Sequence, residues 1–225
     1  MTVAAPCGRR RPVATTETGS QSEHQGATMT EPDRRPALLD AYRLAAEVVA
    51  GVEPAQVSQP TCCTEYDVAA LVDHLVGAGH RAAALGRGQA PSGEAFPHVA
   101  LTEAPDELRR AGQDAGKAWA DDSRLEATVT MEWGETYRGA NLVDMYLAEL
   151  ATHAWDLATA TGQSLGDDDL ARVALEAARA MLRAEYRSMA GPGSPFGPEV
   201  PAPPGATPWE ELAAFMGRSP RPAPS

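Results

Sequence analysis

The feature that most constrains the fold is a proline-free, alanine-rich run from Gly139 to Thr161. Such a run suits an α-helix throughout, because alanine, leucine and methionine lose little conformational freedom there. On a helix, residues four apart share a face, so Glu149 and His153 project side by side, and Asp156 returns to nearly the same direction. A carboxylate and an imidazole on a largely apolar helix are costly to bury unless they pair or bind a metal. The run therefore predicts either a Glu–His hydrogen bond inside a bundle or two ligands of a metal site.

Five other stretches carry apolar residues at helical spacing. Pro36 suits the first turn of one helix, and Gly51 suits the position just beyond its last turn. The run from Leu125 to Trp133 alternates instead and predicts an extended segment that ends at Gly134. The helices are predicted at residues 36–51, 66–87, 105–120, 167–190 and 207–216.

These elements predict an all-α fold, an up-and-down four-helix bundle with a short extra C-terminal helix and one minor extended segment. Residues 191–206 hold six prolines and four glycines and are expected to be irregular. Residues 1–33 are polar, show no apolar period and are expected to form a disordered tail, with Met29 as an alternative start. The folded domain is expected to span residues 34–220.

Composition excludes several classes of protein. The chain of 225 residues has a net charge of -12 and one lysine, so it lacks the clustered cations that nucleic-acid binding requires. No apolar run approaches the roughly 18 residues that span a bilayer, and the arginines at 9–11 are not followed by the apolar core of a secretion signal. Three cysteines do not make a disulfide framework, so a cytoplasmic protein is expected.

A histidine in the middle of the predicted second helix is the natural partner for the pair on the long helix. His74 alone would more often be a hydrogen-bonded core histidine. Together, His74, Glu149 and His153 make a set of two imidazoles and one carboxylate from two packed helices. Such a set leaves coordination positions open, which is typical of catalytic zinc or of non-haem iron. Asp156 is expected to orient a ligand histidine, or else to be a solvated aspartate.

Two blocks of the chain resemble a known family. The first runs from Pro60-Thr61-Cys62-Cys63 into Asp73-His74-Leu75, and the second is Glu149-Leu150-Ala151-Thr152-His153-Ala154-Trp155-Asp156. A weaker third block closes the chain at Gly217-Arg218-Ser219-Pro220. Together they resemble the N-terminal domain of mycothiol-dependent maleylpyruvate isomerase, a family of actinobacterial metal-binding proteins in the DinB-like superfamily. The resemblance covers roughly residues 35 to 220.

The resemblance implies a DinB-like four-helix bundle with a divalent metal, zinc being the expected ion. The family's ligands, a histidine on the second helix and Glu-x-x-x-His on a later one, fall on His74, Glu149 and His153. It also implies mycothiol, a small thiol, as cofactor or co-substrate. The chain is expected to differ from the isomerase by lacking its additional C-terminal domain, which leaves the substrate open.

The predicted function is therefore that of a metal-dependent mycothiol S-transferase or isomerase, in which the metal favours the thiolate as nucleophile. Asp156 is its candidate catalytic residue beside the three metal ligands. The expected partners are the thiol and an electrophilic small molecule, with no nucleic acid and no membrane, for a monomer or homodimer. The alternatives are a hydrolase that activates water at the same metal, and a non-catalytic metal-binding bundle. Cys63 lies eleven residues before His74 and is expected to be a small buried apolar residue outside the metal site.

Overall fold

The long helix α5, Gly139–Thr161, has the bounds that its sequence predicts, and the rest of the fold packs around it. Its C-terminal end is set by Gly162, whose φ of 72° is the left-handed conformation that glycine adopts without a steric cost. The computed structural model describes residues 32–63, 66–89, 98–131, 134–182 and 198–220. Residues 1–31, most of the predicted disordered tail, lie outside the described residues, so that disorder stays a prediction.

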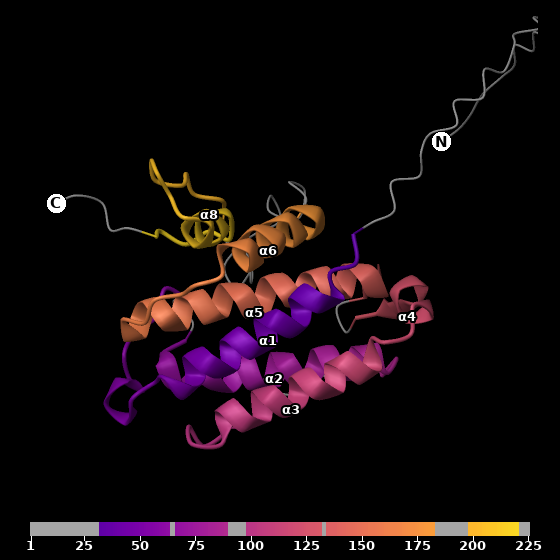
Figure 1. Cartoon of the computed structure of the whole chain (residues 1–225), viewed down its shortest axis with the longest axis horizontal. Coiled ribbons are helices and arrows are strands. Elements are labelled where there is room, and N and C mark those ends of the chain that lie inside the picture. The colour runs from indigo at the N-terminus through magenta and orange to yellow at the C-terminus, as the bar shows by residue number, and fades with distance from the viewer. Residues whose placement is uncertain (1–31, 64–65, 90–97, 132–133, 183–197, 221–225) are drawn as a thin grey trace, which may run out of the picture. The chain divides into compact units, whose positions relative to one another are not determined.

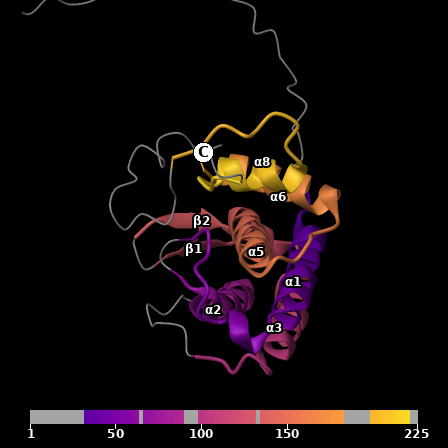
Figure 2. The same cartoon turned by 90° about the vertical axis from the view of Figure 1, so that its left-hand side faces the viewer.

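Four helices make the bundle that the sequence predicts. They are α1, Arg35–Ala50, α2, Val68–Gly86, α3, Ala104–Ala118, and α5. The helix α1 packs against α3 and α5, and α2 packs against the same two helices (Figures 1 and 2). The prediction of an all-α bundle is confirmed, and its apolar stripes meet in one core that includes Leu38, Leu71, Leu75, Leu108, Leu147 and Leu150.

Two more helices cover the side of α5 that faces away from the bundle, as Figure 2 shows. The helix α6, Asp168–Met181, packs on α5, and the short α8, Pro208–Phe215, packs on both. Thr207 caps the start of α8 with a capping box. The Thr207 hydroxyl accepts a hydrogen bond from the Glu210 backbone N–H, and the Glu210 carboxylate accepts one from the Thr207 backbone N–H. The predicted C-terminal helix is confirmed. The predicted 167–190 helix is too long, because α6 ends at Met181 and Leu182 has non-helical backbone angles, φ -91° and ψ 80°. Residues 183–190 lie outside the described part.

The prediction of one extended segment from Leu125 to Trp133 is partly wrong. It opens with a short helix, α4, Ser123–Glu126, and continues as β1, Thr128–Thr130, which pairs antiparallel with β2, Thr136–Arg138. The reason lies before the segment, because the Asp121 carboxylate accepts from the Ser123 backbone N–H and bends the chain into a helical turn. A short 3₁₀ helix, η1, Pro54–Gln56, lies in the connection between α1 and α2.

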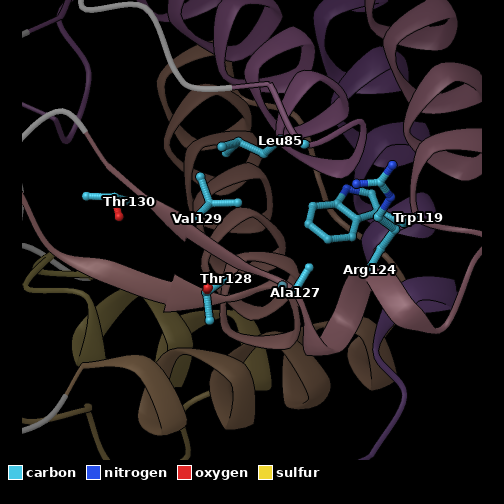
Figure 3. Close-up of a pocket in the computed structure, with 9 residues that line it drawn as sticks. Leu85, Trp119, Arg124, Ala127, Thr128, Val129 and Thr130 are labelled. Atoms are coloured by element: carbon cyan, nitrogen blue, oxygen red, sulfur yellow. The ribbon is translucent and has the colours of Figure 1, made fainter.

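A cavity of about 450 Å³ lies between the end of α2, the start of α5 and the hairpin (Figure 3). Gly139 allows the close approach that forms this end of the bundle, since a Cβ on it would lie 1.9 Å from the Arg124 carbonyl oxygen. None of the described helices is long and apolar enough to cross a membrane.

Candidate metal centre

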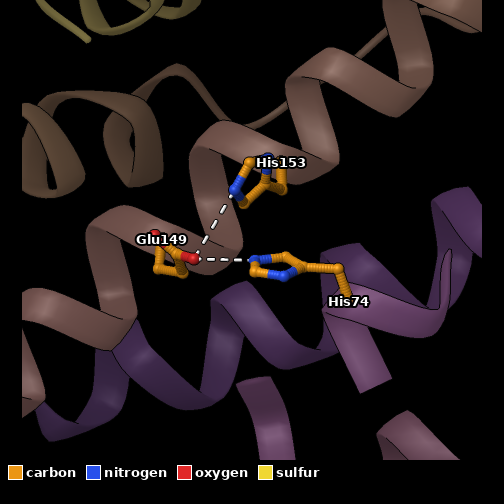
Figure 4. A group of neighbouring side chains, drawn as sticks. All are labelled: His74, Glu149 and His153. Atoms are coloured by element: carbon orange, nitrogen blue, oxygen red, sulfur yellow. Dashed lines mark hydrogen bonds and ion pairs between the residues drawn. The ribbon is translucent and has the colours of Figure 1, made fainter. Parts of the chain in front are cut away.

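The structure brings His74, Glu149 and His153 together in the middle of the bundle, between α2 and α5 (Figure 4). His74 Nε2 lies 2.8 Å from Glu149 Oε1, and His153 Nε2 lies 3.5 Å from the same oxygen. One nitrogen or oxygen from each side chain lies within 4.8 Å of the other two. The two imidazole rings are 4.8 Å apart, edge to face. Three donors from two rigid helices thus converge on one point.

The loop that precedes α2 fixes the start of that helix, and with it the position of His74 on the helix. Asp67 caps the helix by accepting from the Ala70 backbone N–H at 2.8 Å. Before it, the Thr61 hydroxyl contacts the carbonyl oxygens of Cys63 and Tyr66 at 2.9 and 2.7 Å. The Tyr66 ring lies 4.9 Å from the His74 ring and is tilted by 30° to it. The loop therefore holds the Tyr66 ring against the His74 imidazole.

Asp156 lies one turn beyond His153 and is fully buried. Its Oδ2 is 3.0 Å from His153 Nδ1 and accepts a hydrogen bond from the Nδ1–H group. The other ring nitrogen, Nε2, is then directed at Glu149. A carboxylate behind a ligand histidine fixes both its tautomer and its ring orientation. The structure thus places Asp156 where the sequence analysis expects an orienting aspartate.

Arg218 was not assigned a role from the sequence, and it completes this line of contacts. Its terminal nitrogen Nη2 donates to Asp156 Oδ2 at 2.8 Å, and Nε donates to Oδ1 at 3.2 Å. Its Nη1 donates to the Met216 carbonyl oxygen at 2.8 Å, which holds the guanidinium at the end of α8. The pair spans 62 residues of sequence. The one signal was its place in the closing Gly217-Arg218-Ser219-Pro220 block, which resembles the family but does not say what the arginine contacts.

The electrostatics of the site follow from these contacts. Burial opposes ionisation of Glu149, but the His153 and His74 rings outweigh it and hold the pKa of Glu149 well below its usual range. Burial also opposes a charge on His153, yet the Glu149 and Asp156 carboxylates raise its pKa to about 9. Burial alone would raise the pKa of Asp156, but hydrogen bonding by His153 and the charge of Arg218 lower it. Glu149 and Asp156 are therefore carboxylates that favour a cation between them.

A divalent ion fits this donor set. Two imidazole nitrogens and one carboxylate oxygen are the ligands of many catalytic zinc sites, which keep a further position for water or substrate. The His74 and Glu149 side chains keep 16% and 25% of their surface exposed, so the cluster is not fully enclosed by the described residues.

Cys63, on the loop before α2, is less buried than the sequence predicts. Cys63 is half-buried rather than buried, and Cys62 is exposed, on the loop that leads to Tyr66. Burial of the thiol raises the pKa of Cys62, and the negative charge of Asp156 adds to the rise while Arg218 opposes it. The loop therefore lies within electrostatic reach of Asp156, although neither thiol belongs to the cluster of donors in the described residues. Two other histidines form separate surface pairs, His80 with Glu107 and His98 with Asp73.

Comparison with known proteins identifies the family. The family model described as the mycothiol maleylpyruvate isomerase N-terminal domain matches residues 38–158. The chain belongs to this family. The match contains all three donors and Asp156, and it ends sixty residues before Arg218. Membership in the mycothiol maleylpyruvate isomerase N-terminal domain family points to a function related to mycothiol.

Proteins similar to this chain occur in Mycobacterium tuberculosis. Uncharacterised proteins of strains CDC 1551 and H37Rv are each 36% identical over 181 residues, which cover 78% of this chain and 92% of each relative. No solved structure matches the chain.

Proposed function

We propose that this protein is a divalent-metal-dependent enzyme that uses mycothiol as its nucleophile, as a transferase or an isomerase. One observation carries the proposal: His74, Glu149 and His153 converge from two helices, within 4.8 Å of one another, in a chain of the mycothiol maleylpyruvate isomerase N-terminal domain family. Zinc suits such a set of nitrogen and oxygen donors best. When bound there, the ion would supply the positive charge that favours a thiolate over a thiol at neutral pH.

The protein's own residues hold the donors in place for this chemistry. Asp156 would keep the proton of His153 on Nδ1, so that Nε2 would be the nitrogen that holds an ion bound there. Arg218 neutralises the buried Asp156 and fixes the direction of its carboxylate. Both are positioning residues, because they act on the site through His153. The Tyr66 ring beside His74 limits how that imidazole can turn.

The reaction class follows from what becomes of the thiol. The thiolate sulfur attacks an electrophilic carbon of the second substrate and forms a carbon–sulfur bond. At the same time a double bond, an epoxide C–O bond or a leaving-group bond at that carbon breaks, and its electron pair stays on the atom that becomes protonated or departs with the leaving group. If the thioether product leaves, the enzyme is an S-transferase. If the same bond breaks after the substrate has rearranged, the thiol is regenerated and the enzyme is an isomerase.

Calorimetric titration of mycothiol tests the proposal. Mycothiol is added to zinc-loaded and to metal-free protein, in buffers of different ionisation enthalpy. We expect tight binding with release of a proton by the zinc-loaded protein, and much weaker binding by the metal-free form, since the thiolate there lacks its counter-charge.

The sharpest variant is Glu149→Gln, which keeps the shape of the side chain and removes its charge. It should lose zinc and thiol binding together. Glu107→Gln is the matched control, because Glu107 also pairs with a histidine, His80, but on the surface. Equal affinity of both forms without proton release would contradict thiol activation and favour a hydrolase or a non-catalytic metal-binding bundle.

A further inference from the structure

The cavity at the end of the bundle contains a cation that the rest of the fold does not use. Arg124 lines it and is half-buried, and within the described residues its guanidinium makes no hydrogen bond and no ion pair. Eight other described arginines contact a carboxylate oxygen within 3.0 Å, among them Arg34, Arg138 and Arg218. Two further described arginines have other contacts, because Arg87 donates to the Gln89 side chain and the Arg179 guanidinium lies over the Phe215 ring.

Asp121 makes no ion pair with Arg124 in the described residues. Asp121 senses its charge, which contributes to the lowered pKa of that carboxyl, but the larger causes are hydrogen bonds from Ser123. The guanidinium lies close to the backbone at Gly88, since a Cβ there would lie 2.8 Å from Arg124 Nη1. The φ of 75° at Gly88 is a conformation that glycine adopts without a steric cost.

Three large apolar side chains form one part of the wall, and Thr128 and Thr130 are polar residues of the same lining. Figure 3 shows Leu85, Trp119 and Val129 around the same space, with Arg124 beside the indole. The Trp119 Nε1 donates to the Ala82 carbonyl oxygen at 3.0 Å, so the indole has one orientation and its polar atom is already satisfied. A Cβ at Gly86 would lie 2.8 Å from Trp119 Nε1, so the absence of a side chain at Gly86 lets the indole ring pack directly against α2.

We propose that this cavity binds a small organic carboxylate with a flat apolar body. The guanidinium presents two parallel N–H donors that match a carboxylate, and Leu85, Trp119 and Val129 contact the apolar part. A volume of about 450 Å³ lies within the range of small-molecule sites. The cavity is separate from the metal centre, because Leu85 follows His74 by eleven residues, roughly 16 Å along α2 at 1.5 Å per residue.

Benzoate is a suitable probe, with benzyl alcohol as the uncharged control of the same shape. Both are titrated into the full-length, isotope-labelled protein in the presence of a chelator, so that no metal competes for the carboxylate. We expect benzoate to shift the backbone amide signals of residues 85–88 and 128–130, with a dissociation constant on the order of 1 mM for so small a ligand. Benzyl alcohol should bind at least about tenfold more weakly, because it cannot pair with the guanidinium.

Variants then assign the site. Arg124→Gln should weaken benzoate binding at least about tenfold, and Arg124→Lys should weaken it less, since it keeps the charge and loses the fork. Arg172→Gln, which removes an exposed arginine of α6, should leave binding unchanged. Unchanged affinity in a folded Arg124→Gln protein, shifts that map instead to His74, Glu149 and His153, or no shifts at all would each overturn the proposal. Failure of this carboxylate site leaves the metal-centre proposal standing, because zinc and mycothiol binding are measured in a separate titration.

Discussion

His153 depends on two side chains that would not touch a metal. The Asp156 carboxylate accepts a hydrogen bond from His153 Nδ1–H. Arg218 in turn donates two hydrogen bonds to Asp156, from Nε and Nη2. The sequence predicted the three donors and Asp156, because helical spacing alone aligns Glu149, His153 and Asp156. It could not predict Arg218, since that contact depends on how a short helix docks 62 residues later in the chain.

At this scale we predict that Arg218→Gln weakens zinc binding about 10- to 100-fold, the usual effect of removing a group that orients a ligand. The physical reason is that Asp156 loses its counter-charge and its fixed direction, so it no longer holds His153. Competition with a chromophoric chelator measures the affinity, and Arg172→Gln, an exposed arginine of α6 paired at i,i+3, is the control.

The same variant should lower the free energy of unfolding by about 3–5 kcal/mol, because it leaves a buried carboxylate without its partner. Full zinc affinity in a folded Arg218→Gln protein would show that Asp156 positions His153 unaided.

The elements of the fold were predicted closely wherever an apolar stripe and a helix-ending residue coincide. The bounds of α5 agree with the sequence, and those of α1 differ by one residue. The region of α4 and the hairpin was read less well, because it depends on a local hydrogen bond from Ser123 to Asp121 and on pairing with a strand beyond a turn. Tertiary contacts, rather than periodicity, decide such short elements.

Gly139 offers a test at this scale, because α5 begins there against the backbone of α4. A Cβ at Gly139 would lie 1.9 Å from the Arg124 carbonyl oxygen, and a backbone atom cannot move aside as the end of a side chain can. We expect Gly139→Ala to destabilise the protein by about 1–3 kcal/mol through overpacking, measured by urea denaturation. Gly166→Ala is the control, since nothing lies within 4 Å of its Cβ position, and it should be close to neutral. Equal stability of the two variants would mean that the α4–α5 junction can open without loss.

On the scale of the whole molecule, the candidate metal centre joins two helices that are far apart in the sequence. His74 is on α2, while Glu149 and His153 are on α5, and α5 also carries the layer of α6 and α8 on its other side. A ligand that binds the folded chain and not the unfolded one stabilises the whole cooperative unit.

We therefore predict that zinc raises the melting temperature. At a free concentration one hundred times the dissociation constant, the stabilisation is about 2.7 kcal/mol. Differential scanning calorimetry with and without zinc measures it. The increase should disappear in His74→Ala and persist in His80→Ala, whose histidine lies on the surface of the same helix. An equal rise in both variants would place the zinc elsewhere.

The contact between Arg218 and Asp156 also sets an order of events during synthesis. At 5–20 residues per second, the 62 residues between them take about 3–12 s to translate. Until Arg218 has been made, Asp156 lacks the arginine that holds it. We therefore expect the three donors to meet first in a looser arrangement, which the docking of α8 and Arg218 then fixes.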